Sequence, residues 1–368
     1  MPPLLLFIIL TVVILCFTYV NGFHDGCNSV ATLITSRAME PKHALALAAV
    51  VEFLTPFVTI FVGANVAKTI QGIVKESSYV PPAGAAVTQQ DINVALAFVT
   101  AGIVAAIAWN VFTWRVGLPA SSSHALVGGV LGSGIAAYGF SSISWNSVLV
   151  KVVLMVFLTP VVSFIVGFLL MSLIKFLVRR SSPVVNTFFK RFQIINMAFL
   201  AFNHSLNDSQ KSMGIIMLLA SVMHFTPINQ FNANIANFMR TTLHLPVSAS
   251  SPPVWAVACT GLALALGISF GGFKIIRTVG TGIYRVQPID SFTSQLASGF
   301  VILGSSIIGA PVSTSQIVSS SIMGVGSAER FNAVRWGVVK NILFSWVITL
   351  PAVALVGVAL FNVFRFVF

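Results

Sequence analysis

The sequence NGFHDGCNS, at residues 21–29, sets an aspartate among small and polar residues directly after a long apolar segment. The second half of the chain contains a related stretch, FNHSLNDSQK, at residues 202–211. A second pair of stretches follows in the same order: GLPASSSH at 117–124 and GAPVSTSQ at 309–316. Matched polar motifs in two halves of an apolar chain are typical of secondary transporters built from internal repeats. The sequence therefore predicts a duplicated membrane carrier.

The composition supports a membrane protein. Of the 368 residues, 57% are hydrophobic and only 8% are charged, whereas soluble domains carry about 25% charged residues. About 20 apolar residues suffice to cross a bilayer. The stretches without Asp, Glu, Lys or Arg are 1–24, 92–114, 152–174, 241–273, 291–328 and 341–364. We therefore expect an all-α polytopic membrane protein.

Basic residues gather between the apolar stretches, which accounts for the net charge of +12 through the positive-inside rule. The clusters are Arg37 and Lys42; Lys175, Arg179, Arg180, Lys190 and Arg191; Lys274, Arg277 and Arg285; and Arg330, Arg335 and Lys340. Because they form no single basic stripe, we exclude nucleic acid as a partner. The segments 78–91, 141–147 and 222–252 hold almost no Lys or Arg and are predicted to be external, with both termini on the same side.

The two halves are predicted to be inverted-topology repeats. The expected first repeat is 1–178, the basic cytoplasmic linker is 179–191, and the second repeat is 192–368. Each repeat combines spanning helices with a helical hairpin that bears a Pro-x-Ser-Ser/Thr-Ser turn. The expected hairpins are 92–140 around Pro119 and 291–326 around Pro311; the expected spans are the first apolar segment, 43–62, 148–178, 192–222, 254–273 and 341–364. An odd number of crossings separates the copies, which inverts them.

The hydroxyl residues after each proline suggest an anion site. A proline followed by Ser or Thr favours the first turn of a helix, and the free N–H groups there attract anions. The alternative is a pair of ordinary capped helix starts. The residues assigned to the anion are Ser121, Ser122, Ser123, Ser313, Thr314, Ser315, Asn28 and Asn207.

Three acidic residues, Asp25, Glu52 and Asp208, fall within or at the ends of predicted spans. A carboxylate at membrane depth is costly and usually serves ion binding. We assign them to the coupling ion, a proton or sodium, with sodium at Asp25 and Asp208 as the only metal considered; no cofactor is expected. The alternative is a structural ion pair between Asp208 and Lys211. The auxiliary residues are His24, His124, His204 and Lys211, which either take part in ion or anion binding or are simply packed.

These motifs resemble those of the inorganic phosphate transporter (PiT) family, of the bacterial low-affinity phosphate permease type. The matching stretches are 21–32, 117–134, 202–216, 277–280 and 309–335. The resemblance implies an inverted-repeat carrier, a homodimer in the bacterial inner membrane, and cation-coupled phosphate uptake. Ser205, Leu206 and Gln316 depart from the usual family pattern, and the family also contains sulfate permeases.

The function predicted from the sequence is secondary import of inorganic phosphate, alone or as a metal–phosphate complex, coupled to protons or sodium. A sulfate–cation symporter of the same family is the alternative, and an anion channel is the alternative from another class. An enzyme is not expected, because the sequence contains no HExxH-type or nucleophile-elbow motif.

Overall fold

The first apolar segment forms one long helical rod, in which the α-helix becomes a π-helix at the first aspartate motif. In the computed structural model, α1 (Pro3–Asn21) passes into a π-helical segment, Gly22–Gly26, and continues as α2 (Cys27–Thr35). Single π-helical turns inside α-helices are frequent at functional sites. The structure describes residues 3–79, 88–182, 184–223 and 252–368, together with Asn234, Asn237, Met239 and Thr241.

The second span lies where the sequence predicts it. Helix α3 (Pro41–Leu54) continues through a 3₁₀ turn into α4 (Thr59–Val62), so that Pro41–Val62 is one apolar rod of 22 residues. A short helix, α5 (Asn65–Gln71), follows. Most of the predicted external segment 78–91 lies outside the described residues.

The first hairpin consists of α6 (Gln89–Val116) and α7 (Ser122–Tyr138). Helix α6 ends at Gly117, whose φ of 76° is the left-handed conformation that glycine adopts readily. The chain then passes Pro119 and returns as α7. The described hairpin therefore reverses at the proline that the sequence singled out.

The middle of the chain contains two long helices. A rod over Trp145–Val178 combines α8 (Trp145–Val148), a π-helical segment and α9 (Leu154–Val178), and α10 (Val185–Val222) is 38 residues long. Helix α10 thus begins within the predicted linker 179–191. The predicted external segment 222–252 lies almost wholly outside the described residues.

The remaining helices repeat the pattern of spans and a hairpin. Helix α12 (Val254–Phe270) is bent by 63° from α13 (Phe273–Arg277) and the π-helical segment that follows it. The second hairpin consists of α14 (Pro288–Ile307) and α15 (Thr314–Glu329), and α16 (Trp336–Phe364) is the last helix. Among the described residues, five helical rods are long and apolar enough to cross a membrane, or six if the bent pair counts as one span. The chain is therefore a multi-pass membrane protein.

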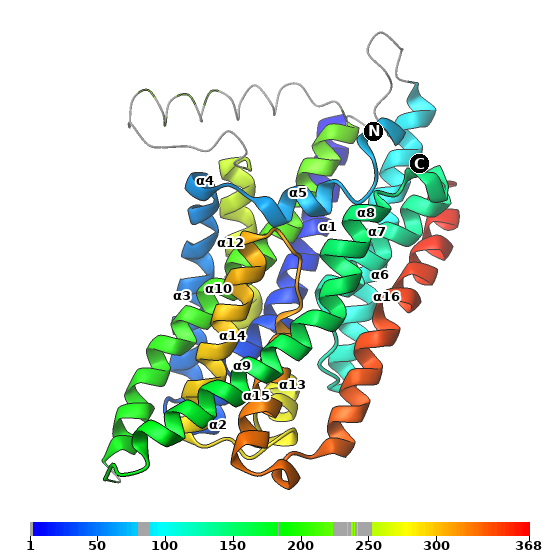
Figure 1. Cartoon of the computed structure of the whole chain (residues 1–368). Coiled ribbons are helices and arrows are strands. Elements are labelled where there is room, and N and C mark those ends of the chain that lie inside the picture. The colour runs from blue at the N-terminus through cyan, green and yellow to red at the C-terminus, as the bar shows by residue number, and fades with distance from the viewer. Residues whose placement is uncertain are drawn as a thin grey trace.

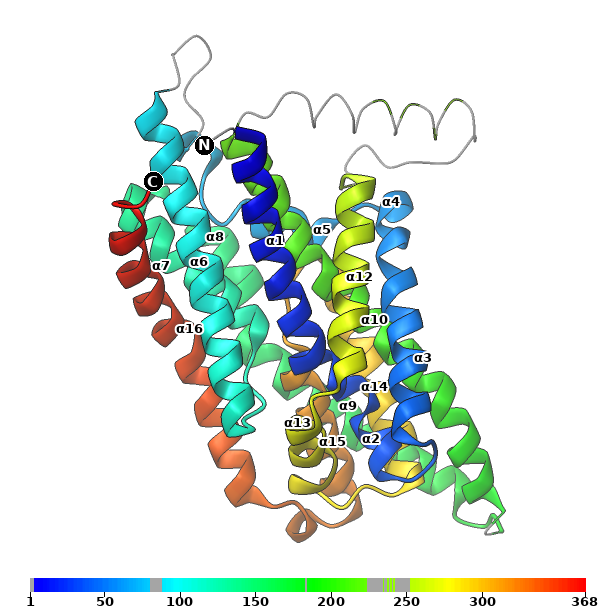
Figure 2. The same ribbon diagram turned by 180° about the vertical axis from the view of Figure 1, so that it is seen from behind.

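The two hairpins enter the helix bundle from opposite ends (Figures 1 and 2). The α6–α7 hairpin starts at the end where both chain termini lie, whereas α14 starts at the other end and rises toward them. The connections from α2 to α3, from α9 to α10 and from α15 to α16 lie at the end opposite the termini. Helix α7 packs on α6 and α16, and α15 packs on α9. The turns of both hairpins therefore reach the interior of the bundle.

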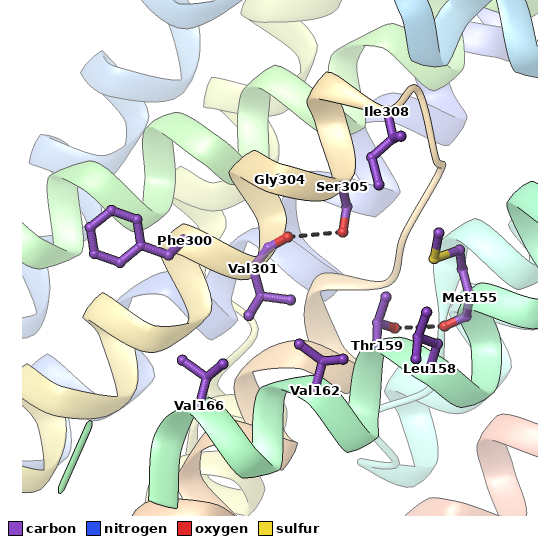
Figure 3. A pocket seen from close by; sticks show the side chains of 10 residues that line it. All are labelled: Met155, Leu158, Thr159, Val162, Val166, Phe300, Val301, Gly304, Ser305 and Ile308. Carbon is purple, nitrogen blue, oxygen red and sulfur yellow. Dashed lines mark hydrogen bonds between the residues drawn. The ribbon is translucent and has the colours of Figure 1, made fainter. Parts of the chain in front are cut away.

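The outer surface also has an apolar groove between α9 and α14, of about 360 Å³ (Figure 3). Its two hydroxyl groups are turned inward to their own helices: Thr159 Oγ1 donates to the carbonyl of Met155, and Ser305 Oγ donates to that of Val301. The groove thus presents apolar atoms, as a lipid-facing surface does. None of the predicted site residues lines it.

Candidate functional site

The two aspartates of the matched motifs lie in the interior of the bundle. Asp25 is in the π-helical segment after α1, and Asp208 is near the middle of α10. Both side chains are fully buried. A buried carboxylate needs partners, and the residues around each aspartate define the site.

Asp25 receives hydroxyl groups from both hairpin turns. Ser315 Oγ donates a hydrogen bond of 2.6 Å to Asp25 Oδ1, and Ser122 Oγ donates a short one to Asp25 Oδ2. The ring nitrogen Nδ1 of His24 lies 2.7 Å from Asp25 Oδ1. Asn28 Nδ2 donates to Ser315 Oγ at 2.9 Å. One carboxylate thus joins a first-half turn to a second-half turn.

The two turns also contact each other directly. Ser121 and Ser313 are the N-cap residues of α7 and α15, and their hydroxyls accept hydrogen bonds from the backbone N–H groups of His124 and Gln316. Ser123 Oγ donates a hydrogen bond of 2.6 Å to the carbonyl of Val312. The N-termini of two helices, of 17 and 16 residues, therefore meet in the interior.

Asp208 has a different set of partners. Lys211 Nζ donates to Asp208 Oδ1 at 2.5 Å, and Asn21 Nδ2 donates to Asp208 Oδ2 at 2.8 Å. The Nε2 atom of His204 lies 3.3 Å from the same Oδ2. Lys211 also reaches Ser123 of the first turn, at 2.5 Å. Asp208 is thus tied to the first half through an asparagine and a lysine.

Glu52 joins this network through a histidine. His204 Nδ1 lies 2.7 Å from Glu52 Oε1, and all atoms of both side chains are buried. Glu52 Oε2 has no hydrogen-bond partner among the described residues. On the other side, His24 Nε2 lies 3.1 Å from Thr113 Oγ1 of α6. Each aspartate therefore has a histidine beside it, and only His204 leads to a third carboxylate.

Some predicted residues lie at the edge of the cluster. Asn207 donates to Ser306 Oγ at 2.9 Å and to the carbonyl of Ala310 at 3.1 Å, so among the described residues its amide binds the second turn rather than an aspartate. Thr314 and His124 are buried, and Thr314 Oγ1 and His124 Nδ1 have no partner in the described part of the chain. These atoms remain available for a ligand at the junction of the turns.

Sequence reasoning left two important groups without a role. Asn21, the first residue of the motif that contains Asp25, contacts Asp208 of the second half and Ser122 of the first. Thr113 of α6 contacts His24, and no motif marks it. The position of Asn21 within a duplicated motif was a usable signal, whereas only the packing of α6 brings Thr113 to the site.

The chemistry of the cluster suits a cation and an oxyanion together. Carboxylate, amide and hydroxyl oxygens are the ligands of hard cations. Backbone N–H groups at helix N-termini and hydroxyls can hold an oxyanion. Every side chain of the cluster is buried, so the described conformation closes the site to solvent.

Comparison with known proteins places this site in a family context. Residues 21–357 match the family described as the phosphate transporter family. A protein of Bacillus subtilis described as a probable low-affinity inorganic phosphate transporter is 36% identical over 366 residues, which cover 99% of each chain. A protein of Rhizobium meliloti with the same description is 33% identical, over 95% of this chain and 93% of its own. The relatives are described as transporters rather than enzymes.

A solved structure described as "The sodium-dependent phosphate transporter" has the same fold. It superposes with a TM-score of 0.78 at 24% sequence identity and covers 99% of this chain and 100% of that one. At this identity the likeness establishes the architecture. The arrangement of helices around the two aspartates is therefore that of a known transporter fold.

Proposed function

Because the chain belongs to the phosphate transporter family, we propose that it is a secondary transporter that brings inorganic phosphate into the cell and is driven by a proton or sodium gradient. The observation that carries this proposal is the meeting of two helix N-termini beside two buried aspartates. One half of the site suits a tetrahedral oxyanion, and the other half suits a cation.

The anion would bind where the two turns meet. Ser123 lies there, as does Thr314, whose Oγ1 has no hydrogen-bond partner in the described part of the chain, and the positive ends of α7 and α15 face the same junction. A hydrogen phosphate ion also carries a proton that it can donate to a carboxylate such as Asp25. Sulfate has no such proton near neutral pH, so the carboxylates favour phosphate over sulfate.

The coupling cation would bind at the aspartates. A negative carboxylate repels phosphate, and this repulsion is strong away from water. A proton on Asp25 removes the repulsion, and a sodium ion there would in addition attract the anion. Cation binding would therefore precede or accompany phosphate binding, which is the physical basis of symport.

We further propose that the halves are inverted repeats that move by alternating access. The opposite entry of the two hairpins supports this arrangement (Figure 1). The contacts from Asp25 to Ser122 and Ser315 would break and re-form as the hairpins move, which would open the site to one side at a time.

The proposed location is the bacterial inner membrane, with both termini external. The connections from α2 to α3, α9 to α10 and α15 to α16 carry basic clusters and lie at the end opposite the termini, as cytoplasmic connections do. The resemblance to the PiT family supports a homodimer. Light scattering of the purified protein in detergent would test the dimer.

The experiment that tests this function is accumulation of radiolabelled phosphate in proteoliposomes under an imposed proton gradient and, separately, a sodium gradient. We expect accumulation above the external concentration under one of the two gradients, and collapse when that gradient is dissipated. An anion channel would only equilibrate phosphate. Failure to accumulate phosphate under both gradients, or equal competition by sulfate, would overturn the proposal.

A metal–phosphate complex is the finer alternative for the transported species. Accumulation should then require a divalent cation outside the vesicles and should carry radiolabelled metal with the phosphate. Uptake of phosphate in the presence of a chelator would restrict the substrate to free phosphate.

A further inference from the structure

Two residues at matched positions in the two motifs differ in charge. Asn28 lies three residues after Asp25, and Lys211 lies three residues after Asp208. The first is a neutral amide and the second is a cation. The two aspartate centres are therefore built on the same spacing but with different electrostatics.

The side chains of these two residues meet corresponding hydroxyls. Asn28 Nδ2 donates to Ser315 Oγ at 2.9 Å, and Lys211 Nζ donates to Ser123 Oγ at 2.5 Å. Each of these serines lies four residues after the proline of its turn. Position and partner both agree, so Asn28 and Lys211 are counterparts in space as well as in sequence.

The ammonium group of Lys211 has the surroundings of a bound hard cation. Its three donors are directed to Asp208 Oδ1 at 2.5 Å, Ser123 Oγ at 2.5 Å and the carbonyl oxygen of Val312 at 3.0 Å. An ammonium has three donors, so all of them are used. Carboxylate, hydroxyl and backbone carbonyl oxygens are also the usual ligands of a hard metal cation. The side chain is fully buried.

The Asp25 centre has no such fixed charge. Among the described residues no Lys or Arg forms an ion pair with Asp25, whose neighbour is the imidazole of His24. Asn28 Oδ1 is buried and has no hydrogen-bond partner within the described ranges. This centre offers a carboxylate, the hydroxyl of Ser315 and a free amide oxygen, which together can receive a cation from outside.

We propose that Lys211 is a tethered cation that permanently occupies the cation site of the second half, and that Asp25 therefore holds the single exchangeable coupling cation. The inference rests on the proposed function and specifies its stoichiometry. Asp208 is neutralised in every step of the cycle, whereas Asp25 is neutralised only when an external cation binds. One cation is then coupled to each transported anion, instead of the two that a pair of Asp–Asn centres would bind.

The test replaces Lys211 with the residue that stands at the matched position. In Lys211→Asn, the ammonium is lost and an amide oxygen is offered beside Asp208. The measurement is the number of ²²Na⁺ ions bound per chain by the purified protein in detergent, without phosphate. We expect no more than one sodium ion on the wild-type chain and one more on Lys211→Asn than on the wild type.

A matched variant separates the loss of charge from the gain of a ligand. Lys211→Met removes the ammonium and offers no oxygen, so we expect it to bind no more sodium than the wild type. Changing Asp208 to Asn in the Lys211→Asn variant should likewise abolish binding of the additional sodium ion. A second readout is thermal unfolding followed by tryptophan fluorescence. Sodium should raise the midpoint of Lys211→Asn more than that of Lys211→Met.

Each outcome decides the inference. Two sodium ions on the wild-type chain would overturn it, and that result needs no variant to fold. An unchanged sodium count in folded Lys211→Asn, with weaker phosphate binding, would instead make Lys211 an anion ligand. The sodium count does not depend on phosphate uptake. A wild-type chain that fails to accumulate phosphate would therefore refute the proposed function and leave this measurement interpretable.

Discussion

Asn21 donates a hydrogen bond of 2.8 Å to Asp208, which lies in the other half of the chain. Its side-chain oxygen lies 2.7 Å from Ser122 Oγ, and the single hydroxyl proton of Ser122 is shared between this oxygen and the carboxylate of Asp25. One amide therefore links the two aspartate centres through a single hydroxyl. A change at one aspartate can reach the other along this path, which is the connection that a coupled carrier needs.

Replacing Asn21 with Ala should weaken this link. Loss of a hydrogen bond to a buried charged group costs about 1.5–3 kcal/mol, and about 1.4 kcal/mol corresponds to tenfold in rate. We expect the variant to fold and its initial rate of phosphate uptake to fall by about tenfold or more. The measurement is radiolabelled phosphate uptake into proteoliposomes, normalised to reconstituted protein.

The control for Asn21 is another buried asparagine that is remote from the aspartates. Asn196 of α10 donates one hydrogen bond, of 3.0 Å, to the carbonyl of Phe292. Asn196→Ala should lower the unfolding temperature about as much as Asn21→Ala does, while leaving phosphate uptake nearly unchanged. Equal loss of uptake in both variants would mean that Asn21 supports only the packing of the bundle.

Neutralising the two aspartates should have different effects on stability. Asp25→Asn keeps an oxygen and an N–H₂ group that can pair with Ser122 and Ser315, so we expect a folded protein without uptake. Asp208→Asn leaves the buried ammonium of Lys211 without its carboxylate, and breaking such a pair costs about 3–5 kcal/mol. It should therefore unfold at a clearly lower temperature than Asp25→Asn.

A double variant checks the reason for this difference. Asp208→Asn combined with Lys211→Met removes both charges, so its unfolding temperature should rise again toward that of the wild type, while uptake stays absent. Thermal unfolding followed through the six tryptophans measures this. If the double variant is no more stable than Asp208→Asn, the ion pair is not the source of the loss. Wild-type uptake by both single variants would refute the assignment of the aspartates.

Close helix contacts at the first hairpin predict a strong effect of one added methyl group. A Cβ on Gly132 of α7 would collide with the carbonyl oxygen of Ala354 of α16. Small residues at such contacts let membrane helices approach. We expect Gly132→Ala to lower the unfolding temperature and the yield of folded protein, because α7 carries the first turn and must move away from α16.

Gly337 provides the matched control for this substitution. It lies near the start of α16, and a Cβ there would meet no atom within 4 Å. Gly337→Ala should be neutral or should stabilise the helix by up to about 1 kcal/mol. Similar unfolding temperatures for Gly132→Ala and the wild type would show that α7 and α16 are not held at this contact.

The elements whose signal is local were predictable from the sequence. The proline turns and the spans 43–62 and 341–364 are marked by turn residues and by uninterrupted apolar runs, and the structure contains helices there. The basic residues Lys190 and Arg191 indicate a linker over 179–191, whereas α10 begins at Val185. A helix can extend beyond the membrane with charged residues on it, and hydropathy does not register that extension.

The residues of the candidate site were predictable from the sequence, but the contacts between them were not. The motifs identify Asp25, Asp208 and the hydroxyl residues, because charged and hydroxyl groups stand out in an apolar chain. Which serine hydrogen-bonds to which aspartate depends on how the hairpins pack, because the two residues of each pair are more than 90 positions apart in the sequence. Asp25 and Ser315, for example, are 290 positions apart. The role of Lys211 likewise requires the contacts with Ser123 and Val312, which no sequence spacing reveals.

The pair Glu52 and His204 leads to a prediction about coupling rather than about binding. Glu52 lies 2.7 Å from His204, which in turn lies 3.3 Å from Asp208, and one oxygen of Glu52 has no partner among the described residues. When the coupling ion is a proton, this row of groups is a route for it into the site, and Asp25 remains the group that holds it. Glu52→Gln keeps the shape of the side chain and the hydrogen bond to the histidine but removes the titrating carboxylate. Glu52→Gln should therefore still carry phosphate across the membrane but no longer use the ion gradient to accumulate it.

We expect Glu52→Gln proteoliposomes to exchange internal unlabelled phosphate for external labelled phosphate, and to fail to accumulate phosphate under a proton gradient. Exchange needs only the anion site and the conformational change, whereas accumulation needs the coupling ion. Glu40→Gln, at an exposed glutamate before α3, is the control and should do both. If Glu52→Gln accumulates phosphate as the wild type does, Glu52 takes no part in coupling. If it loses exchange as well, the residue is needed for binding or for the conformational change, and the proton path through His204 is refuted.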